Sequence, residues 1–398
     1  MAFLSKAVQE TRHAAMRILM TEQGLDGLVF TQADFFQFAS NFNLDVQTWE
    51  RPVALVLPKE GAPFALLNEL STHHWQMAGE RGQLWVEEAT FYDEHIGRAN
   101  AERLITAWGA ILAEALRARG LAAGRLAADT VTAVLAGVAE HLPELTIEAR
   151  TAELRALRWR KHPEELELMR AAAALSDWSQ DRYREEIRPG RLVQELDAAM
   201  HAAIFEEAAK RFPGEHLEVR GYTLTGPASA SPHGNGALTG LRIEEGHGLV
   251  NIVIPRLNGL VIENERTYFC GPPDDEQIRL YAAALAANEA AIAQMVKGNP
   301  VRAIEDAARG VIEEAGYGRH IRHRTGHGIG LIGHEYPEDM AFNERPLMAG
   351  EVYSAEPGIY VYGLGGFRVD DTVIVGETPE VITQSPKDLA SITLPVSL

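Results

Sequence analysis

The spacing of hydrophobic positions changes along the chain, and the change predicts two kinds of domain. The first part alternates short apolar runs, at 27–30 and 53–57, with a helical stretch at 101–119. Strands separated by helices are typical of an α/β domain. We expect this domain to cover residues 1–155.

A second pattern begins at Pro163, which can open a helix, and Glu164 and Glu165 suit the positive end of the helix dipole. This helix should run to about Glu186, and Pro189 should stop it. The remaining predicted elements are two helices near 275–296 and 301–314, and β-rich runs at 249–254, 260–269, 352–362 and 372–375. This pattern therefore predicts that residues 156–398 form an α+β domain whose strands carry polar side chains.

Composition narrows the class of protein. A chain of 398 residues is too long for one ordinary core, and 46% hydrophobic with 23% charged residues is typical of a soluble globular protein. The formal charge of −19 argues against nucleic acid or an anionic membrane as a partner, because both attract basic clusters. The single cysteine, Cys270, excludes an internal disulfide framework, and the amino-terminal stretch lacks the apolar core of a signal peptide. We expect a cytoplasmic protein.

Polar residues gather in segments of the second domain that are marked by glycine or proline. The segments are 231–234, 263–267, 325–330 with His334 just after it, 356–360 and 365–372. Glycines beside a histidine let the backbone approach a ligand closely, and Pro357 fixes a turn behind Glu356. A single histidine or glutamate of this kind is more often structural than catalytic. Only the five segments together are evidence for a functional site.

The order and spacing of all these segments resemble the pita-bread family of methionine and proline peptidases, prolidases and creatinases. The resemblance covers Leu154 to Val375, and the first domain resembles the extra domain of the prolidase and creatinase branch. It implies an α/β N-terminal domain, residues 1–155, followed by an α+β pita-bread (creatinase/aminopeptidase) catalytic domain, residues 156–398.

In the peptidases of this family, five residues hold two metal ions, and one of the five positions is altered here. The corresponding positions are Ile252, Glu263, His327, Glu356 and Asp370. An isoleucine cannot bind a metal, so one ion should be lost, because a two-metal site needs carboxylates around ions ~4 Å apart. The other four residues could still surround one divalent ion.

Glu265 favours a metal-free site instead. Peptidases of the family usually have the first threonine of a Thr-Arg-Thr sequence there, whereas creatinase, a metal-free amidinohydrolase, has Glu-Arg-Thr. By the same resemblance His233 corresponds to the catalytic histidine, Glu356 to a substrate-binding glutamate, and Arg51 to an arginine that reaches the partner subunit's site. A second carboxylate-binding arginine of creatinase is replaced by Glu338, which disfavours creatine itself.

The resemblance therefore implies a hydrolase for a compact cyclic amidine that carries a carboxylate. Ectoine fits this description, and the expected reaction opens its ring to N-acetyl-2,4-diaminobutyrate without a metal or other cofactor. The residues expected to catalyse it are His233, Glu265 and Glu356. The residues expected to bind substrate are Arg51, His327, His334 and Glu263. The Arg51 assignment also implies a homodimer.

Other interpretations stay open at this point. One is a creatinase-type amidinohydrolase acting on another guanidino or amidino acid. Another is a one-metal Xaa-Pro peptidase that uses Glu263, His327, Glu356 and Asp370. A third is a protein-binding module that has kept the fold after its metal site decayed.

Overall fold

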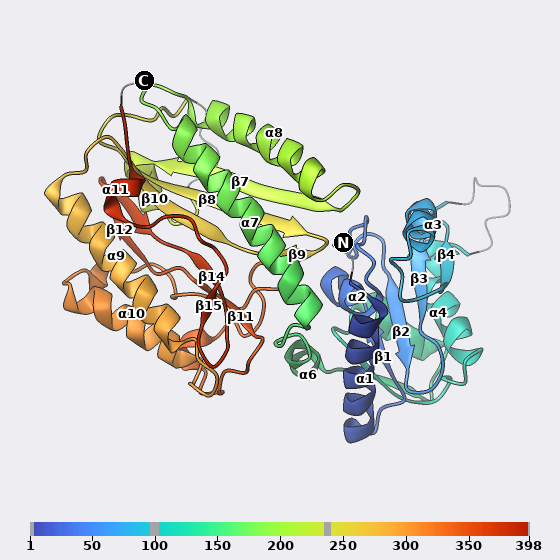
Figure 1. The fold of residues 1–398 in the computed structure, drawn as a ribbon. Helices are drawn as coiled ribbons and strands as arrows, with labels where there is room; N and C mark the ends of the chain where they lie inside the picture. The colour runs from blue at the N-terminus through green and yellow to red at the C-terminus, as the bar shows by residue number, and fades with distance from the viewer. Residues whose placement is uncertain (1–3, 96–102, 235–239, 397–398) are drawn as a thin grey trace. The chain divides into compact units, whose positions relative to one another are not determined.

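The computed structural model describes residues 4–95, 103–234 and 240–396. The chain divides into two compact units, with the boundary between Arg158 and Trp159 (Figure 1). We call them the N-terminal unit and the C-terminal unit.

The N-terminal unit is the predicted α/β domain. Its helices are α1 (Lys6–Gln23), α2 (Ala33–Ser40), α3 (Thr72–Glu80), α4 (Trp108–Arg117), α5 (Ala133–Ala136) and α6 (Thr151–Ala156). Its strands are β1 (Gly27–Phe30), β2 (Ala54–Pro58), β3 (Phe64–Asn68), β4 (Glu88–Tyr92), β5 (Gly124–Ala128) and β6 (Leu145–Ala149). They form one mixed sheet in the order β4-β3-β2-β1-β5-β6.

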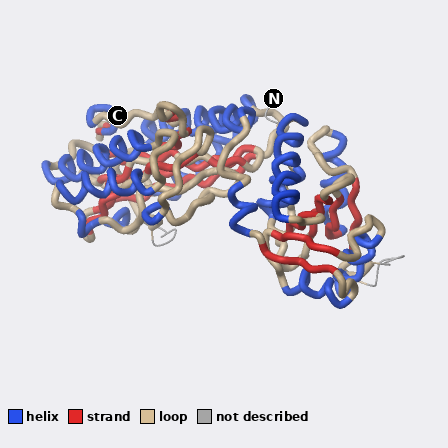
Figure 2. Tube along the Cα trace, turned by 90° about the horizontal axis from the view of Figure 1, so that it is seen from below, coloured by secondary structure: helices blue, strands red, loops and turns tan. Residues whose placement is uncertain are grey.

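Both faces of this sheet are covered by helices (Figure 2). Val29 of β1 packs into a core with Ile111 and Leu112 of α4, while Phe30 stacks on Phe35 of α2 with ring centroids 6.3 Å apart. Neighbouring strand residues point to opposite faces. A continuous apolar run such as Gly27–Phe30 is therefore the pattern of a strand buried on both sides.

The C-terminal unit contains longer helices and an antiparallel sheet. Its helices are α7 (Pro163–Glu186), α8 (Val193–Arg211), α9 (Asp275–Gln294), α10 (Arg302–Glu314) and α11 (Leu389–Ile392). Helix α7 begins at Pro163 as predicted, and a capping box, in which His162 and Glu165 bond each other's backbone, stabilises that end. Helices α7 and α8 lie across strands β7 and β8, whereas α9 and α10 pack side by side (Figure 1).

The strands of the C-terminal unit form three sheets. They are β7 (Leu217–Thr225), β8 (Gly248–Leu257), β9 (Leu260–Val261), β10 (Asn264–Cys270), β11 (Val352–Ala355), β12 (Gly358–Val361), β13 (Gly365–Arg368), β14 (Asp371–Ile374), β15 (Glu380–Val381) and β16 (Thr393–Leu394). The largest sheet has the order β16-β10-β8-β7, with β9 paired to β8. Strands β11, β14 and β15 form a second sheet, and β12 pairs with β13.

Several predicted elements are shorter or divided. The described part of the stretch at 101–119 contains a short 3-10 helix, Ile105–Ala107, and an α-helix, Trp108–Arg117; residues 96–102 lie outside the described part of the chain. The run at 260–269 separates into β9 and β10, and the run at 352–362 breaks at Glu356 and Pro357. Proline has no N–H group to donate to a ladder, which explains the second break. Strand β7 was not predicted at all.

One apolar core joins α8, α9 and α10 to the strands of the C-terminal unit, from β8 through β14. The core fixes the strands on which the polar segments lie. Among the described residues, no helix combines the length and the apolar character needed to cross a membrane.

Candidate metal centre

A row of side chains crosses neighbouring strands of the C-terminal unit. Ile252 of β8 lies directly opposite Glu265 of β10 in an antiparallel pair. The backbones of Glu265 and Asp370 are paired in turn by two N–H to O hydrogen bonds of 3.2 and 3.0 Å. Directly opposed residues of antiparallel strands project to the same face. Positions 252, 265 and 370 therefore form one row, which the sequence order does not show.

His327 lies in the middle of the buried polar cluster with 1% of its surface exposed. Its Nδ1 lies 3.0 Å from the Gly328 carbonyl oxygen, which can only accept, so Nδ1 carries the hydrogen. Its Nε2 lies 3.3 Å from a carboxylate oxygen of Glu263 and 3.2 Å from one of Glu356. A histidine fixed through Nδ1 to a carbonyl, with Nε2 facing carboxylates, has the orientation of a metal ligand.

Two glycines make this placement of His327 possible. A Cβ atom at Gly326 would lie 2.1 Å from the Ser354 carbonyl oxygen, and one at Gly328 would lie 2.5 Å from the Tyr336 carbonyl oxygen. Neither backbone atom can give way cheaply. Gly326 and Gly328 are therefore required by the close approach of neighbouring backbone.

His334 lies against His327, with the two rings stacked and their centroids 3.8 Å apart. Unlike His327 it is exposed. Partial desolvation of the ring, and then the positive charge of His327, lower the pKa of His334, which favours the neutral ring that binds metals.

Four carboxylates share the buried cluster and repel one another. Burial, with further contributions from Glu356 and Glu263, raises the pKa of Glu265 to about 8 despite the Arg368 guanidinium. Burial and the charges of Glu265 and Glu263 raise the pKa of Asp370 well above its usual range. Full ionisation of this cluster therefore needs a cation.

Glu356 and His327 show how a positive charge relieves that repulsion. Burial alone would raise the pKa of Glu356, but its contact with His327 outweighs burial and lowers the pKa to about 2. Burial likewise opposes protonation of His327, yet Glu263 and Glu356 raise its pKa well above the usual value. Either a proton on Nε2 or a cation between these groups satisfies them.

The Arg368 side chain contacts a carboxylate of the row directly. Its guanidinium forms an ion pair with Glu265 and lies 3.2 Å from the Tyr360 hydroxyl. The side chain is 1% exposed. One guanidinium against four carboxylates leaves the cluster acidic.

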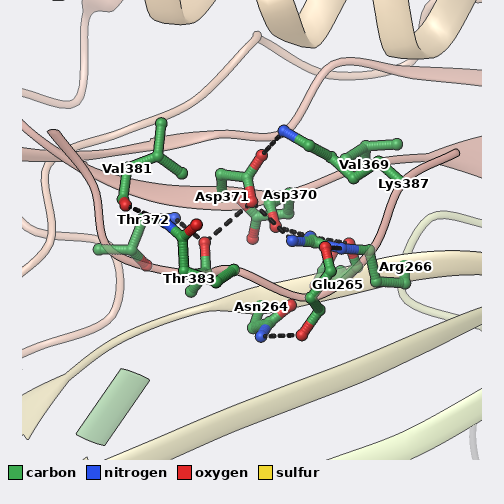
Figure 3. Close-up of polar contacts among 12 residues, drawn as sticks. Asn264, Glu265, Arg266, Val369, Asp370, Asp371, Thr372, Val381, Thr383 and Lys387 are labelled. Atoms are coloured by element: carbon green, nitrogen blue, oxygen red, sulfur yellow. Dashed lines mark hydrogen bonds and ion pairs between the residues drawn. The ribbon is translucent and has the colours of Figure 1, made fainter. Parts of the chain in front are cut away.

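A second buried arginine holds the backbone of the cluster. Arg266 donates through one nitrogen to the carbonyls of both Glu265 (2.8 Å) and Asp370 (2.6 Å). Its other nitrogens donate to Asp371 (2.7 Å) and to the Ser385 carbonyl (3.0 Å). Figure 3 shows the Arg266 side chain beside Glu265, Asp370 and Asp371. Arg266 is thus a positioning residue for the carboxylate residues Glu265, on β10, and Asp370, just before β14.

The potential ligand atoms fall into two groups of three, each with its atoms within 4.8 Å of one another. One group contains Glu263, His327 and His334, and the other contains Glu265, Glu356 and Asp370. Both carboxylate oxygens of Asp370 are buried without a hydrogen-bond partner among the described residues. Buried polar atoms are almost always satisfied, so these orphaned atoms fit a site for divalent cations.

A pocket of about 380 Å³ in the C-terminal unit opens onto this cluster. Glu263, Glu265 and Glu356 line it on the acidic side, and His233 and His334 also border it. His233 is exposed at this wall. The pocket therefore brings together the predicted site residues of the C-terminal unit except His327 and Asp370, which contact or adjoin its acidic wall without lining it.

Arg51 lies in the N-terminal unit. There its guanidinium pairs with Glu94 and Glu50. Its predicted reach into a partner subunit's site stays a prediction.

Sequence reasoning missed the β7 side of the pocket. Arg220 and Tyr222 both line it, and Tyr222 lies opposite Ile252. The alternation of Glu218, Val219 and Arg220 along this segment was the available signal, because polar and apolar residues alternate on a half-exposed strand.

Comparisons with known proteins identify the family of the chain. The model of metallopeptidase family M24 matches residues 167–377. The chain is 32% identical, over 98% of both sequences, to a protein named probable dipeptidase PepE of Mycobacterium bovis. It is also 32% identical to the Xaa-Pro dipeptidase of Pyrococcus furiosus, over 58% of this chain and 65% of that one. The chain belongs to metallopeptidase family M24.

Solved structures cover both units. Dipeptidase PepE from Mycobacterium ulcerans superposes with a TM-score of 0.81 at 29% identity, over 99% of this chain and 100% of that one. The Xaa-Pro dipeptidase from Bacillus anthracis, at 23% identity and a TM-score of 0.78, covers 97% of this chain and 99% of its own and supports the fold alone. The predicted fold class, an α/β N-terminal domain with a pita-bread catalytic domain, is confirmed.

Proposed function

We propose that the protein is a metal-dependent hydrolase of small peptides, a dipeptidase or Xaa-Pro dipeptidase, in which Glu263, His327 and His334 bind a divalent cation. The observation that carries this proposal is the geometry of His327. Its Nδ1 is committed to a backbone carbonyl, while its Nε2 faces two carboxylates. The names of the relatives support the peptide substrate.

The donor set indicates the kind of ion. Carboxylate oxygens with imidazole nitrogens suit manganese, zinc or iron. A bound ion of this kind would act as a Lewis acid on the substrate carbonyl.

The chain's own residues supply the other functions of the site. His233 on the pocket wall is placed for proton transfer to or from the substrate. Glu356 lies between the two ligand groups and orients His327.

A panel assay tests the proposal. Purified protein is analysed for metal and then incubated with dipeptides, including Xaa-Pro dipeptides, before and after chelation. We expect cleavage that disappears with chelator and returns with the ion, and that His327→Ala abolishes. The matched control His73→Ala removes an exposed histidine of α3 and should leave turnover unchanged.

A second candidate is metal-independent opening of ectoine to N-acetyl-2,4-diaminobutyrate. Ile252 in place of a metal-binding aspartate favours it, as does Glu265 in a Glu-Arg-Thr sequence. The acidic wall of the pocket suits a cyclic amidinium, because carboxylates give such a cation charge-assisted hydrogen bonds.

The same panel separates the two candidates when it includes ectoine and creatine. Ring opening of ectoine that survives chelation, without cleavage of any dipeptide, would overturn the peptidase proposal. Dipeptide cleavage without turnover of ectoine would remove the second candidate.

A further inference from the structure

We propose that Glu265 replaces the metal-binding aspartate missing at position 252, so that the protein binds two divalent ions instead of one. This inference rests on the proposed metal dependence and adds a second ion to it. In effect, the carboxylate has moved from β8 to the facing position of the next strand.

The first argument is that positions 252 and 265 project into the same space. Ile252 and Glu265 face each other in the antiparallel β8–β10 pair, so their side chains project from the same face. Ile254, two residues along β8 and therefore on the same face as Ile252, lines the pocket together with Glu265. A carboxylate from either position can thus enter the same space. Glutamate, with one more methylene than aspartate, has the extra reach that the neighbouring strand requires.

The second step is the composition of the ligand set. The family pattern provides four carboxylates and one histidine, and the loss at Ile252 removes one carboxylate. With Glu265, the number of carboxylates in the set is again four. Its carboxylate lies with those of Glu356 and Asp370 in a group separate from Glu263, His327 and His334. Two groups of ligands, each complete enough to hold an ion, are what a two-ion site requires.

The third argument comes from the carboxylate oxygens of Asp370, which lack hydrogen-bond partners among the described residues. Its side chain is fully buried, and neither of its carboxylate oxygens has a hydrogen-bond partner among the described residues. It adjoins Glu265 through a two-way backbone pairing. Two adjacent buried carboxylates of like charge repel unless one of them is protonated or a cation lies between them. A divalent cation would also give the unpartnered oxygens of Asp370 a partner.

The ion pair between Arg368 and Glu265 is compatible with this role. The Arg368 contact involves Oε2 of Glu265, which leaves Oε1 for an ion. Arg368 alone offsets a single negative charge of the four carboxylates. One divalent ion would still leave the buried cluster negative, so the charge of the cluster is compatible with a second ion.

Metal content tests the inference without an activity assay. Wild-type protein and variants are loaded with Mn²⁺, dialysed and analysed for manganese per chain, and electron paramagnetic resonance reports coupling between adjacent Mn²⁺ ions. We expect two ions with a coupled spectrum in the wild type. Glu265→Thr, which installs the usual residue of the peptidases, should bind one ion and lose the coupling. The isosteric Glu265→Gln should do the same.

A double variant provides the rescue. Ile252→Asp combined with Glu265→Thr returns the carboxylate to β8 and should restore two ions and the coupled spectrum. Circular dichroism and thermal unfolding check that each variant is folded. If Glu265→Thr does not fold, Glu265→Gln takes its place.

The outcomes separate the two proposals. One ion in the wild type, unchanged in Glu265→Thr, would overturn the role of Glu265 while leaving a one-metal peptidase intact. Two ions that persist in both single variants would also overturn it. No bound ion in the wild type would refute metal dependence itself, and with it the inference.

Discussion

Replacing Asp371 by asparagine should destabilise the C-terminal unit strongly, because Asp371 is the counter-ion of the buried Arg266. Its carboxylate accepts from Arg266 at 2.7 Å, from Lys387 at 2.7 Å and from the Thr383 hydroxyl at 2.9 Å (Figure 3). The Arg266 and Asp371 side chains are both 0% exposed. Asparagine keeps the shape and removes the charge.

The size of the effect follows from that burial. Removing one partner of a buried ion pair costs about 3–5 kcal/mol, since the remaining charge loses its compensation. Asparagine keeps one acceptor oxygen, so we expect roughly 3 kcal/mol. For a domain of this size that corresponds to a fall in Tm of roughly 6–12 °C.

The loss should depend on pH in a defined direction. Burial alone would raise the pKa of Asp371, but Arg266 and Lys387 outweigh it and hold the pKa below its usual value. A depressed carboxyl pKa contributes stability above the unfolded pKa of about 4, and the contribution disappears as pH falls through the folded pKa. The difference between wild type and Asp371→Asn should therefore be largest near pH 7 and shrink below about pH 4.

Urea unfolding, followed by circular dichroism at pH 7 and below about pH 4, measures the free energy of unfolding of both proteins. The control is Glu377→Gln, which removes an ion pair with Lys297 whose side chains are 83% and 54% exposed. It should change stability by less than about 1 kcal/mol. If Asp371→Asn at pH 7 unfolds within about 1 kcal/mol of wild type, the assignment of Asp371 as the essential counter-ion is wrong.

Three further predictions address the site. Gly326→Ala should weaken metal binding at least tenfold and destabilise the protein by roughly 1–3 kcal/mol, because the added Cβ would lie 2.1 Å from the Ser354 carbonyl oxygen. Gly310→Ala in α10, where the Cβ meets no atom within 4 Å, should instead stabilise it by about 0.5–1 kcal/mol; calorimetry compares the two, and equal effects would contradict the packing argument. Mn²⁺ at about 100 times its Kd should stabilise the protein by about 2.7 kcal/mol over the chelated form, and a Tm that does not respond to ion or chelator would count against the metal centre. His233→Ala should remove turnover without lowering Tm, since the side chain is exposed at the pocket; wild-type kinetics in this variant would exclude it from the reaction.

Local signals predicted the parts of the structure that depend on neighbouring residues. Pro163 with the two glutamates after it gave the start of α7, and the end at Glu186 also agrees. The polar segments around His327 and Glu356 were identified because glycine and proline mark their backbone. The resemblance to the pita-bread family identified the fold.

Features that depend on strand register could not be predicted from the sequence. Ile252 was recognised as a lost metal ligand, but its position opposite Glu265 follows only from the pairing of β8 with β10. The division of the ligands also needed coordinates, because Glu356 groups with Glu265 and Asp370 although it also contacts His327. Strand β7 was missed although Pro213-Gly214 and Gly226-Pro227 mark turns on either side of it. Gly221 interrupts the alternation of its side chains.

The hydrogen bonds of Arg266 have a consequence for how such a site can change. Arg266 holds the carbonyls of Glu265 and Asp370 and makes no use of either carboxylate. The backbone frame is therefore independent of which side chain in the row carries the negative charge. A lineage can transfer a carboxylate from one strand to the next, or shorten and lengthen it, without rebuilding the fold, so chemistry in this family can drift while architecture stays constant.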